Sequence, residues 1–158
     1  MPQDKIWTVA VAGCGVGRNH IAQGYGKHPD KFRVVAVCDI DQGRLAAVGD
    51  ELSVPRRTRS FDEVPRMDDI DIVDICTPAM LHFEQILATL STGKDVVCEK
   101  PLVGSIAEID RIIVTEKATP GRVMPIFSVP FWQWSAKGQA DHRVGDRRQA
   151  LSCHRRDS

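Results

Sequence analysis

Apolar runs of strand type alternate with helical segments along the chain, and this alternation restricts the fold more than any other feature of the sequence. The connections are short, and no internal repeat is present. Such alternation predicts βαβ units with right-handed crossovers, and therefore an α/β fold with a doubly wound, mostly parallel sheet and helices on both faces. The strand-like runs occupy residues 7–12, 32–38, 70–76, 95–98 and 122–127, and helices are expected at 18–27, 41–52, 80–92 and 105–117.

Two Ser-x-x-Glu sequences mark expected helix starts. Ser60 with Glu63, and Ser105 with Glu108, have the spacing of a capping box, in which each side chain binds a free backbone N–H of the first turn. We therefore expect a short helix after Ser60 and a longer one after Ser105.

The length and charge of the chain exclude several classes of protein. Its 158 residues suit one domain of ordinary size, which is large enough to bury a core. Lys and Arg number 21, and Asp and Glu also number 21, so charge gives no basis for binding nucleic acid or an anionic membrane surface. No stretch approaches the roughly 20 uncharged apolar residues that a membrane helix needs. We therefore expect a soluble domain with neither nucleic-acid nor membrane partners.

A glycine-rich turn follows the first strand run and leads directly into a helix. It reads Gly13-Cys14-Gly15-Val16-Gly17. Glycines at such a turn let backbone N–H groups approach a pyrophosphate, which the helix N-terminus also favours. The pattern is GxGxG in place of the usual GxGxxG, and a purely structural turn is the alternative interpretation. The position between a strand and a helix favours a dinucleotide-binding turn.

An acidic residue, Asp39, stands at the end of the second strand run, 26 residues after Gly13. At this position a carboxylate can accept hydrogen bonds from the adenosine ribose of a dinucleotide. The alternative is that Asp39 caps the following helix, a role for which Asp41 is better placed. A carboxylate repels a 2′-phosphate, so NAD(H) is the expected cofactor and NADP(H) is less favoured, although Arg44 is close in sequence.

Thr77 and Pro78 directly follow the strand run 70–76, and His82 lies at the entry to the next helix. Because ligands bind outside the carboxyl ends of the strands in such sheets, all three residues are candidates for the site. A single histidine at a helix start is more commonly a surface or core residue, and that alternative stays open for His82.

Glu99-Lys100-Pro101 directly follows the strand run 95–98. An ion pair of Glu99 and Lys100 at the end of a buried strand buries no apolar surface, which favours a role in binding. Lys100 can donate hydrogen bonds to a cofactor ribose and to a substrate hydroxyl, with Glu99 orienting it.

Two segments carry a resemblance to a known family. They are DICTPAMLH, residues 74–82, and GKDVVCEKP, residues 93–101, whose Glu-Lys-Pro triplet is the most specific feature. The chain resembles, over about residues 6–127, the N-terminal domain of the glucose–fructose oxidoreductase, inositol dehydrogenase and rhizopine-catabolism (Gfo/Idh/MocA) oxidoreductases. The resemblance implies a Rossmann-type fold and hydride transfer between nicotinamide and a secondary alcohol of a sugar or polyol.

The same resemblance implies roles for individual residues. The three glycines of the turn approach the diphosphate, Asp39 the adenosine ribose, and Lys100 the nicotinamide ribose and the substrate as the catalytic lysine. Thr77, Pro78 and His82 line the nicotinamide side. No metal site is expected. The full set of expected cofactor-binding residues is Gly13, Cys14, Gly15, Val16, Gly17, Asp39, Thr77, Pro78, His82, Glu99, Lys100 and Pro101.

The five cysteines show neither a CxxC pair nor zinc-ligand spacing. Cys14, Cys38, Cys76 and Cys98 fall at the carboxyl ends of predicted strands, so a metal or redox cluster is an alternative, but small buried thiols beside a cofactor are favoured. The first apolar run is short for a signal peptide, and Asp4 lies where such a peptide is basic. We therefore expect reduced thiols and a cytoplasmic location.

Residues 128–158 break the pattern, with two of the three tryptophans, six basic residues, one leucine and no periodicity. We expect a dinucleotide-binding domain over 1–127 followed by an irregular, disordered tail. Family members, as the resemblance implies, are about twice as long and have a second α+β domain. A forward shift of the reading frame by one base converts each Trp codon into a glycine codon, and permitted codons then give AYRFGNGLQK from Ser128. Because this resembles the family's continuation, an out-of-frame tail is a hypothesis for this segment.

Three functions compete. The favoured one is the cofactor domain of an NAD(H)-dependent sugar or polyol dehydrogenase, incomplete as it stands, with its oligomer interface in the second domain. The alternatives are a stand-alone dinucleotide-binding module without catalysis and an inactive, truncated remnant.

Overall fold

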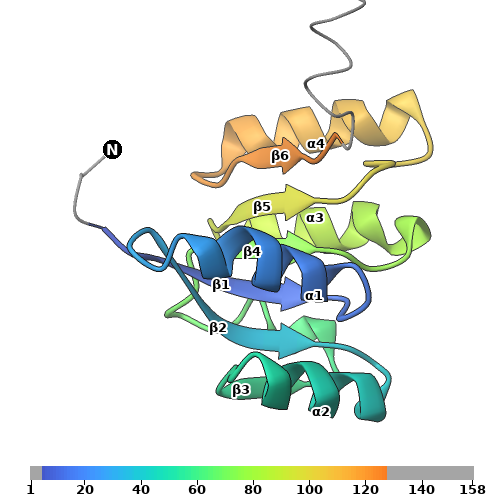
Figure 1. Cartoon of the computed structure of the whole chain (residues 1–158). Helices are drawn as coiled ribbons and strands as arrows, with labels where there is room; N and C mark the ends of the chain where they lie inside the picture. Colours follow the sequence, from blue (N-terminus) through green and yellow to red (C-terminus); the bar gives the residue numbers. More distant parts are fainter. Residues whose placement is uncertain (1–4, 128–158) are drawn as a thin grey trace, which may run out of the picture. The chain divides into compact units, whose positions relative to one another are not determined.

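Six strands form one sheet in which every neighbouring pair is parallel, in the order β3-β2-β1-β4-β5-β6 (Figure 1). This computed structural model describes residues 5–127, and the expected irregular tail, 128–158, lies outside the described residues. The predicted α/β fold with a parallel sheet is confirmed. The strands are β1 (Trp7–Ala12), β2 (Phe32–Cys38), β3 (Arg56–Thr58), β4 (Ile72–Ile75), β5 (Asp95–Cys98) and β6 (Val123–Pro125).

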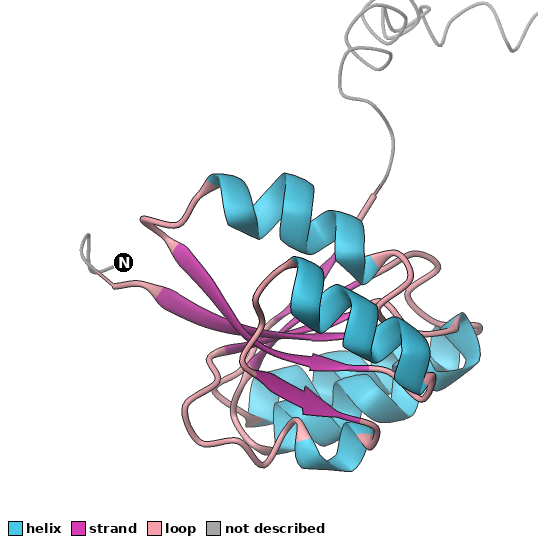
Figure 2. Ribbon diagram, turned by 60° about the horizontal axis from the view of Figure 1, so that its bottom comes forward, coloured by secondary structure: helices cyan, strands magenta, loops and turns pink. Residues whose placement is uncertain are grey.

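Helical segments cover both faces of the sheet (Figure 2). One face carries the helical run that starts with α1, together with α2, and the other face carries α3 and α4 (Figure 1). The segments are α1 (Gly17–Asn19), the π-helical turn η1 (His20–Gly24), the 3-10 turn η2 (Tyr25–Lys27), α2 (Gln42–Glu51), the 3-10 turns η3 (Phe61–Glu63) and η4 (Ala79–Leu81), α3 (His82–Ser91) and α4 (Ile106–Ala118).

The central strands are buried on both faces, which explains their unbroken apolar sequences. In β1, Val9 and Val11 pack against the face of α2, whereas Ala10 and Ala12 pack against the face of α3. All four are at most 1% exposed. Full burial of a valine side chain contributes roughly 1.5–3 kcal/mol, so β1 is a main source of stability and a rigid base for the turn that follows it.

The chain starts in the middle of the sheet and changes direction there. It runs outward from β1 through β2 to β3, and then returns to β4, which pairs with the other side of β1. Ala12 at the end of β1 therefore lies between Cys38 of β2 and Ile75 of β4. A reversal of strand order of this kind opens a crevice beyond the carboxyl ends of the strands, where ligands bind.

Of the two predicted capping boxes, one is confirmed and one is wrong. Ser105 Oγ accepts a hydrogen bond from the backbone N–H of Glu108 at 3.3 Å and opens α4. Ser60 makes no such bond, and Glu63 accepts a hydrogen bond from Thr58 Oγ1 at 2.6 Å instead. Only the 3-10 turn η3 follows there.

Element boundaries differ from expectation in four places. The short strand β3 was not expected, because its sequence is polar and basic. The strands expected at 70–76 and 122–127 are shorter in the structure, and the helix expected at 18–27 is divided into α, π and 3-10 turns. Among the described residues, no helix is both long enough and apolar enough to cross a membrane.

Candidate dinucleotide-binding site

The glycine-rich turn lies at the crossing point of β1, β2 and β4. Gly13 has φ +93°, a region that favours glycine, and a Cβ there would lie 2.6 Å from the carbonyl carbon of Cys76. Its N–H donates to the carbonyl of Cys38 at 2.7 Å. At Gly17 a Cβ would lie 2.5 Å from Val11 Cγ1, so this glycine lets the helix start close to the strand. Gly15, in contrast, faces open space, with no atom within 4 Å of its Cβ position.

Asp39 fixes this turn to the end of β2. Its Oδ2 accepts the backbone N–H of Cys14 at 2.9 Å, and its Oδ1 accepts the backbone N–H of Asp41 at 2.9 Å. Asp41 caps α2 by accepting the N–H of Arg44 at 2.8 Å, so Asp39 is not the capping residue. Arg44 also lies 3.3 Å from Asp39 Oδ2 through Nη1, and its side chain is 52% exposed. The carboxylate therefore touches both the turn and the strand end, with one mobile cation beside it.

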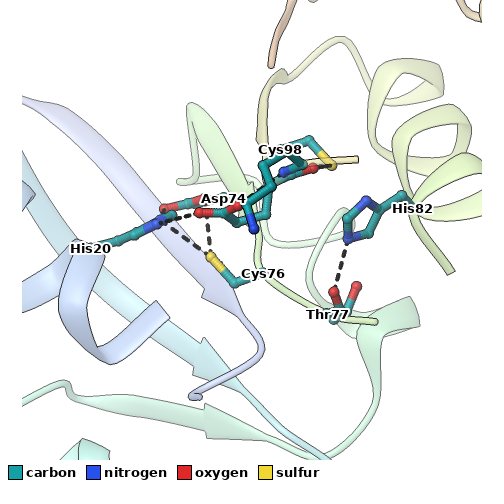
Figure 3. Close-up of polar contacts among 8 residues, drawn as sticks. His20, Asp74, Cys76, Thr77, His82 and Cys98 are labelled. Carbon is teal, nitrogen blue, oxygen red and sulfur yellow. Dashed lines mark hydrogen bonds and ion pairs between the residues drawn. The ribbon is translucent and has the colours of Figure 1, made fainter. Parts of the chain in front are cut away.

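The loop after β4 brings Thr77 and Pro78 to the same edge of the sheet. Thr77 Oγ1 donates to Gln85 Oε1 at 2.5 Å, and Pro78 is exposed. His82 is only 1% exposed, and its Nδ1 lies 2.9 Å from the carbonyl oxygen of Pro101. Its Nε2 lies 2.8 Å from the carbonyl oxygen of Thr77 (Figure 3). Each ring nitrogen thus faces a carbonyl oxygen, and a neutral ring donates its one N–H to either of them, so His82 lies between the two loops. Its contact with nicotinamide stays a prediction.

The predicted ion pair between the side chains of Glu99 and Lys100 is not formed. Glu99 Oε2 accepts the backbone N–H of Lys100 at 2.9 Å, and Oε1 lies 3.2 Å from His20 Nε2. Within residues 5–127, no carboxylate lies within 4 Å of the Lys100 ammonium, which is exposed at the rim. The reason is that the two oxygens of the Glu99 carboxylate already contact the backbone N–H of Lys100 and the imidazole of His20. The Lys100–Pro101 peptide bond is cis.

A buried polar cluster lies under the helical run, at the end of β4 (Figure 3). His20 Nδ1 lies 2.9 Å from Asp74 Oδ2 and 3.3 Å from Cys76 Sγ, and Sγ lies 3.4 Å from Asp74 Oδ1. The hydrogen bond with Asp74 raises the pKa of His20, although burial acts in the opposite direction, and Glu99 adds to the rise. Burial and the charge of Asp74 raise the pKa of the Cys76 thiol, which is therefore protonated at neutral pH.

His20 and Asp74 were not among the residues expected at the site. A signal for Asp74 is present in the sequence, because an acidic residue interrupts the apolar run 70–76 at a position where a strand buried on both faces has no water. Its partner cannot be read from the sequence, since the two residues are 54 positions apart.

Cys14, Cys38 and Cys98 are buried, free thiols. Burial raises the pKa of Cys14 to about 11 and of Cys98 to about 12, and it also raises that of Cys38 to about 12. Because the thiolate is the reactive form, these thiols are inert at neutral pH. Their small size fits the interpretation of packing residues beside the crevice.

The fold and this edge define a class of protein, the dinucleotide-binding α/β domain. The strand order is that of the Rossmann fold, with a glycine turn at the switch point and an acid at the end of β2. The model of the oxidoreductase family with an NAD-binding Rossmann fold (GFO_IDH_MocA) matches residues 7–127. The chain belongs to this family, and the predicted family and NAD cofactor class are confirmed.

Individual relatives agree with this assignment. Inositol 2-dehydrogenase 3 of Saccharopolyspora erythraea is 33% identical over 119 residues, which cover 75% of this chain and 35% of the relative. D-xylose 1-dehydrogenase (NADP(+)) 2 of Haloferax volcanii is 37% identical over 78 residues, covering 49% and 24%. The structure of scyllo-inositol dehydrogenase from Lactobacillus casei, solved with NAD(H) and scyllo-inositol, matches at a TM-score of 0.67 with 26% identity, covering 75% and 36%. The chain thus spans about a third of the length of such relatives.

Proposed function

We propose that this chain is the NAD(H)-binding domain of a sugar or polyol dehydrogenase. The dinucleotide lies across the carboxyl edge of the sheet, with its diphosphate at the Gly13–Gly17 turn and its adenosine ribose at Asp39. In the complete reaction, a hydride passes between C4 of the nicotinamide and a secondary alcohol carbon. The substrate class is supported by the relatives, several of which are named for inositol or sugar dehydrogenation.

The observation that carries this proposal is the hydrogen bond between Asp39 and the backbone of Cys14. It ties the acid that would hold the ribose to the turn that would hold the diphosphate, so the two contacts are preorganised relative to each other. Gly15 also supports the proposal, because the open space at its Cβ position leaves room for a phosphate to approach the backbone.

Arg44 decides how strongly NAD(H) is favoured over NADP(H). A carboxylate offers about four acceptor positions, and three on Asp39 are occupied by Cys14, Asp41 and Arg44. For two ribose hydroxyls to bind, Arg44 must leave. Once displaced, the same guanidinium stays close to Asp39 in sequence and can pair with a 2′-phosphate. The pair therefore favours NAD(H) through Asp39 and weakens that preference through Arg44.

Lys100 would serve the substrate oxygen. Its ammonium is exposed and has no carboxylate partner within residues 5–127, while Glu99 fixes its backbone. An ammonium has donors and no acceptor, so it can polarise a carbonyl or hold an alkoxide as hydride is transferred. The base that takes up the alcohol proton would then come from another part of the complete protein, as would the oligomer interface.

An equilibrium titration of NADH fluorescence tests the proposal. We expect saturable binding that Asp39→Asn weakens by about 10-fold or more, since hydrogen bonds to a charged group contribute about 1.5–3 kcal/mol. Arg44→Gln should increase the preference for NADH over NADPH. Asp110→Asn, which removes the same charge from the exposed surface of α4, is the matched control and should bind like the unmodified chain.

Two further results would redirect the proposal. A folded chain that binds no dinucleotide would identify an inactive remnant. Reduction of NAD by a panel of polyols, abolished by Lys100→Ala, would show that the chain alone is a complete enzyme, whereas we expect no turnover without a second wall to the substrate pocket.

A further inference from the structure

Three different metal-binding atoms meet under the helical run. They are His20 Nδ1, Asp74 Oδ2 and Cys76 Sγ, with Asp74 wholly buried and the other two partly buried. Asp74 belongs to β4 and Cys76 directly follows this strand, two residues later, so their side chains leave the same face of the sheet. His20 reaches them from the first residue of the π-helical turn η1, a type of turn that occurs frequently at functional sites.

The spacing of these atoms is close to the spacing of ligand atoms around a bound metal ion. Tetrahedral zinc with bonds of about 2.0 Å to nitrogen and oxygen and about 2.3 Å to sulfur separates its ligand atoms by about 3.2–3.6 Å. The observed separations are 3.3 Å from Sγ to Nδ1, 3.4 Å from Sγ to Asp74 Oδ1 and 2.9 Å from Nδ1 to Asp74 Oδ2. The sulfur faces Oδ1 and the imidazole faces Oδ2, so each oxygen of Asp74 lies next to one of the other two ligand atoms. A shift of a few tenths of an ångström would bring the shortest of these separations into the range for zinc.

The surroundings supply what such a site requires beyond its ligands. Glu99 Oε1 lies 3.2 Å from His20 Nε2, which is the carboxylate–histidine arrangement that orients metal-bound imidazoles. Asp74 and Glu99 place two carboxylates around a single imidazole, and their ion pairs within residues 5–127 are with that imidazole alone. A cluster with an excess of anionic groups favours a divalent cation over a neutral or anionic ligand.

The cluster also has an entrance. A surface depression of about 560 Å³ is lined by His20 together with Asn19, Gln23 and Ile126. The His20 side chain is 18% exposed, so it forms the boundary between this depression and the buried carboxylate. Of the three ligand residues only His20 lines this depression, so an ion would reach the cluster past its ring.

We propose that His20, Asp74 and Cys76 form a binding site for one Zn²⁺ ion per chain, with Glu99 as the positioning residue for His20. The mixture of nitrogen, oxygen and sulfur donors selects zinc among the common divalent ions. Binding displaces the thiol proton of Cys76 and the Nδ1 proton of His20 to solvent, so the ion is bound by a thiolate and a neutral imidazole. Three protein ligands leave a fourth position open for water or a substrate oxygen. This departs from the expectation that the chain has no metal site, and it does not depend on cofactor binding.

Titration of the metal-free, full-length chain with Co²⁺, followed by Zn²⁺, tests the proposal. We expect a tetrahedral cobalt spectrum with a thiolate-to-cobalt charge-transfer band that saturates at one ion per chain and is displaced by Zn²⁺. Cys76→Ser should lose the charge-transfer band. Cys98→Ser, another buried thiol, and Cys153→Ser, a cysteine outside the described residues, are the matched controls and should keep it.

Glu99→Gln separates a positioning role from a ligand role. It should keep the band and lower the metal affinity about 10- to 100-fold, the usual effect of removing a partner of a metal-bound histidine. If Cys76→Ser does not fold by circular dichroism, His20→Asn takes its place and should abolish stoichiometric binding. A chain that shows no saturable charge-transfer band overturns the proposal, as does a band that survives Cys76→Ser or disappears in Cys153→Ser.

Discussion

The two edges of the sheet differ in how completely their lysine ammonium groups are paired. At the edge where the strands begin, Asp71 accepts hydrogen bonds from Lys5 Nζ at 2.7 Å and from the backbone N–H and Oγ1 of Thr8, both at 2.9 Å. Lys94 Nζ likewise donates to the carbonyl of Ile70 at 3.0 Å. At the edge where the strands end, the ammonium of Lys100 has no carboxylate partner within the described residues. Polar groups that satisfy one another stabilise the fold, whereas groups with remaining capacity are available to a ligand.

Exposed apolar side chains are also more frequent at the carboxyl edge, while at the opposite edge Ile6, which precedes β1, is 47% exposed. Large side chains that are 45–86% exposed follow β1, β2 and β4 at the carboxyl edge: Val16, Ile40, Met80 and Leu81. Exposed apolar groups that gather beside polar ones are typical of binding surfaces. The carboxyl edge is therefore built to be covered, and the opposite edge is built to hold the strands together.

The largest effect is expected at Gly13. Gly13→Ala would force a left-handed backbone on alanine and press its Cβ into the Cys76 backbone, and we expect a loss of about 3 kcal/mol or more in the free energy of unfolding. At Gly15 an added Cβ has no atom within 4 Å. Gly15→Ala should therefore change the free energy of unfolding by less than about 1 kcal/mol while weakening NADH binding. Urea denaturation checks both, and equal losses of stability would contradict the assignment of separate roles to the two glycines.

An intermediate effect is expected at the opposite edge. Asp71→Asn should lower the free energy of unfolding by about 1–3 kcal/mol, because it weakens a charged acceptor of three hydrogen bonds. NADH affinity should stay unchanged, since this edge lies away from the crevice. A parallel loss of NADH affinity in a folded variant would break the comparison between the edges.

The same variant gives a pH signature. Burial opposes ionisation of Asp71, but Lys5 and Thr8 outweigh it and lower the pKa of the carboxyl below its usual value. The stabilisation is thus fully present above the unfolded pKa of about 3.9 and is lost as the pH falls through the lower folded pKa. The stability difference between the unmodified chain and Asp71→Asn should be constant near neutral pH and shrink in acid, and a difference that grows in acid would contradict this sign.

The smallest effect on stability is expected at Lys100. Lys100→Ala removes an exposed ammonium without a carboxylate partner in the described part of the chain, and should change the free energy of unfolding by no more than about 0.5 kcal/mol. Lys5→Ala, which removes an ammonium paired with Asp71, is the comparison and should cost more. Thermal melts of the two variants measure the difference, and a larger loss at Lys100 would assign it a structural role.

Much of the fold can be predicted from local sequence, and the places where the prediction fails have physical reasons. The apolar runs of β1 and β2 have the predicted bounds, because strands buried on both faces leave a continuous signal. Ser60 and Ser105 begin the same Ser-x-x-Glu pattern, yet only Ser105 caps a helix. The difference is Thr58, whose hydroxyl donates a hydrogen bond to the carboxylate of Glu63. Thr58 belongs to β3, a strand too short and too polar to be predicted from the sequence.

The site was predictable to the extent that it lies in loops beside strand ends. The turn at Gly13 and the acid at Asp39 lie together as the strand order requires. The pairing of Glu99 could not be predicted, because its partner His20 comes from a helix 79 residues earlier, and only the assembled sheet brings the two together. Sequence proximity suggests Lys100 as the ionic partner of Glu99, whereas in the folded chain the imidazole of His20 takes that position.

The buried ring of His82 has a consequence for the motion of two loops. His82 joins the carbonyl of Thr77 to that of Pro101, and so links the loop after β4 to the loop after β5 through a single buried ring. We therefore expect a displacement of either loop to disturb the other through this ring. Joint opening of the two loops exposes both segments at once, so amide protons of the two loops would exchange with solvent in a single cooperative event.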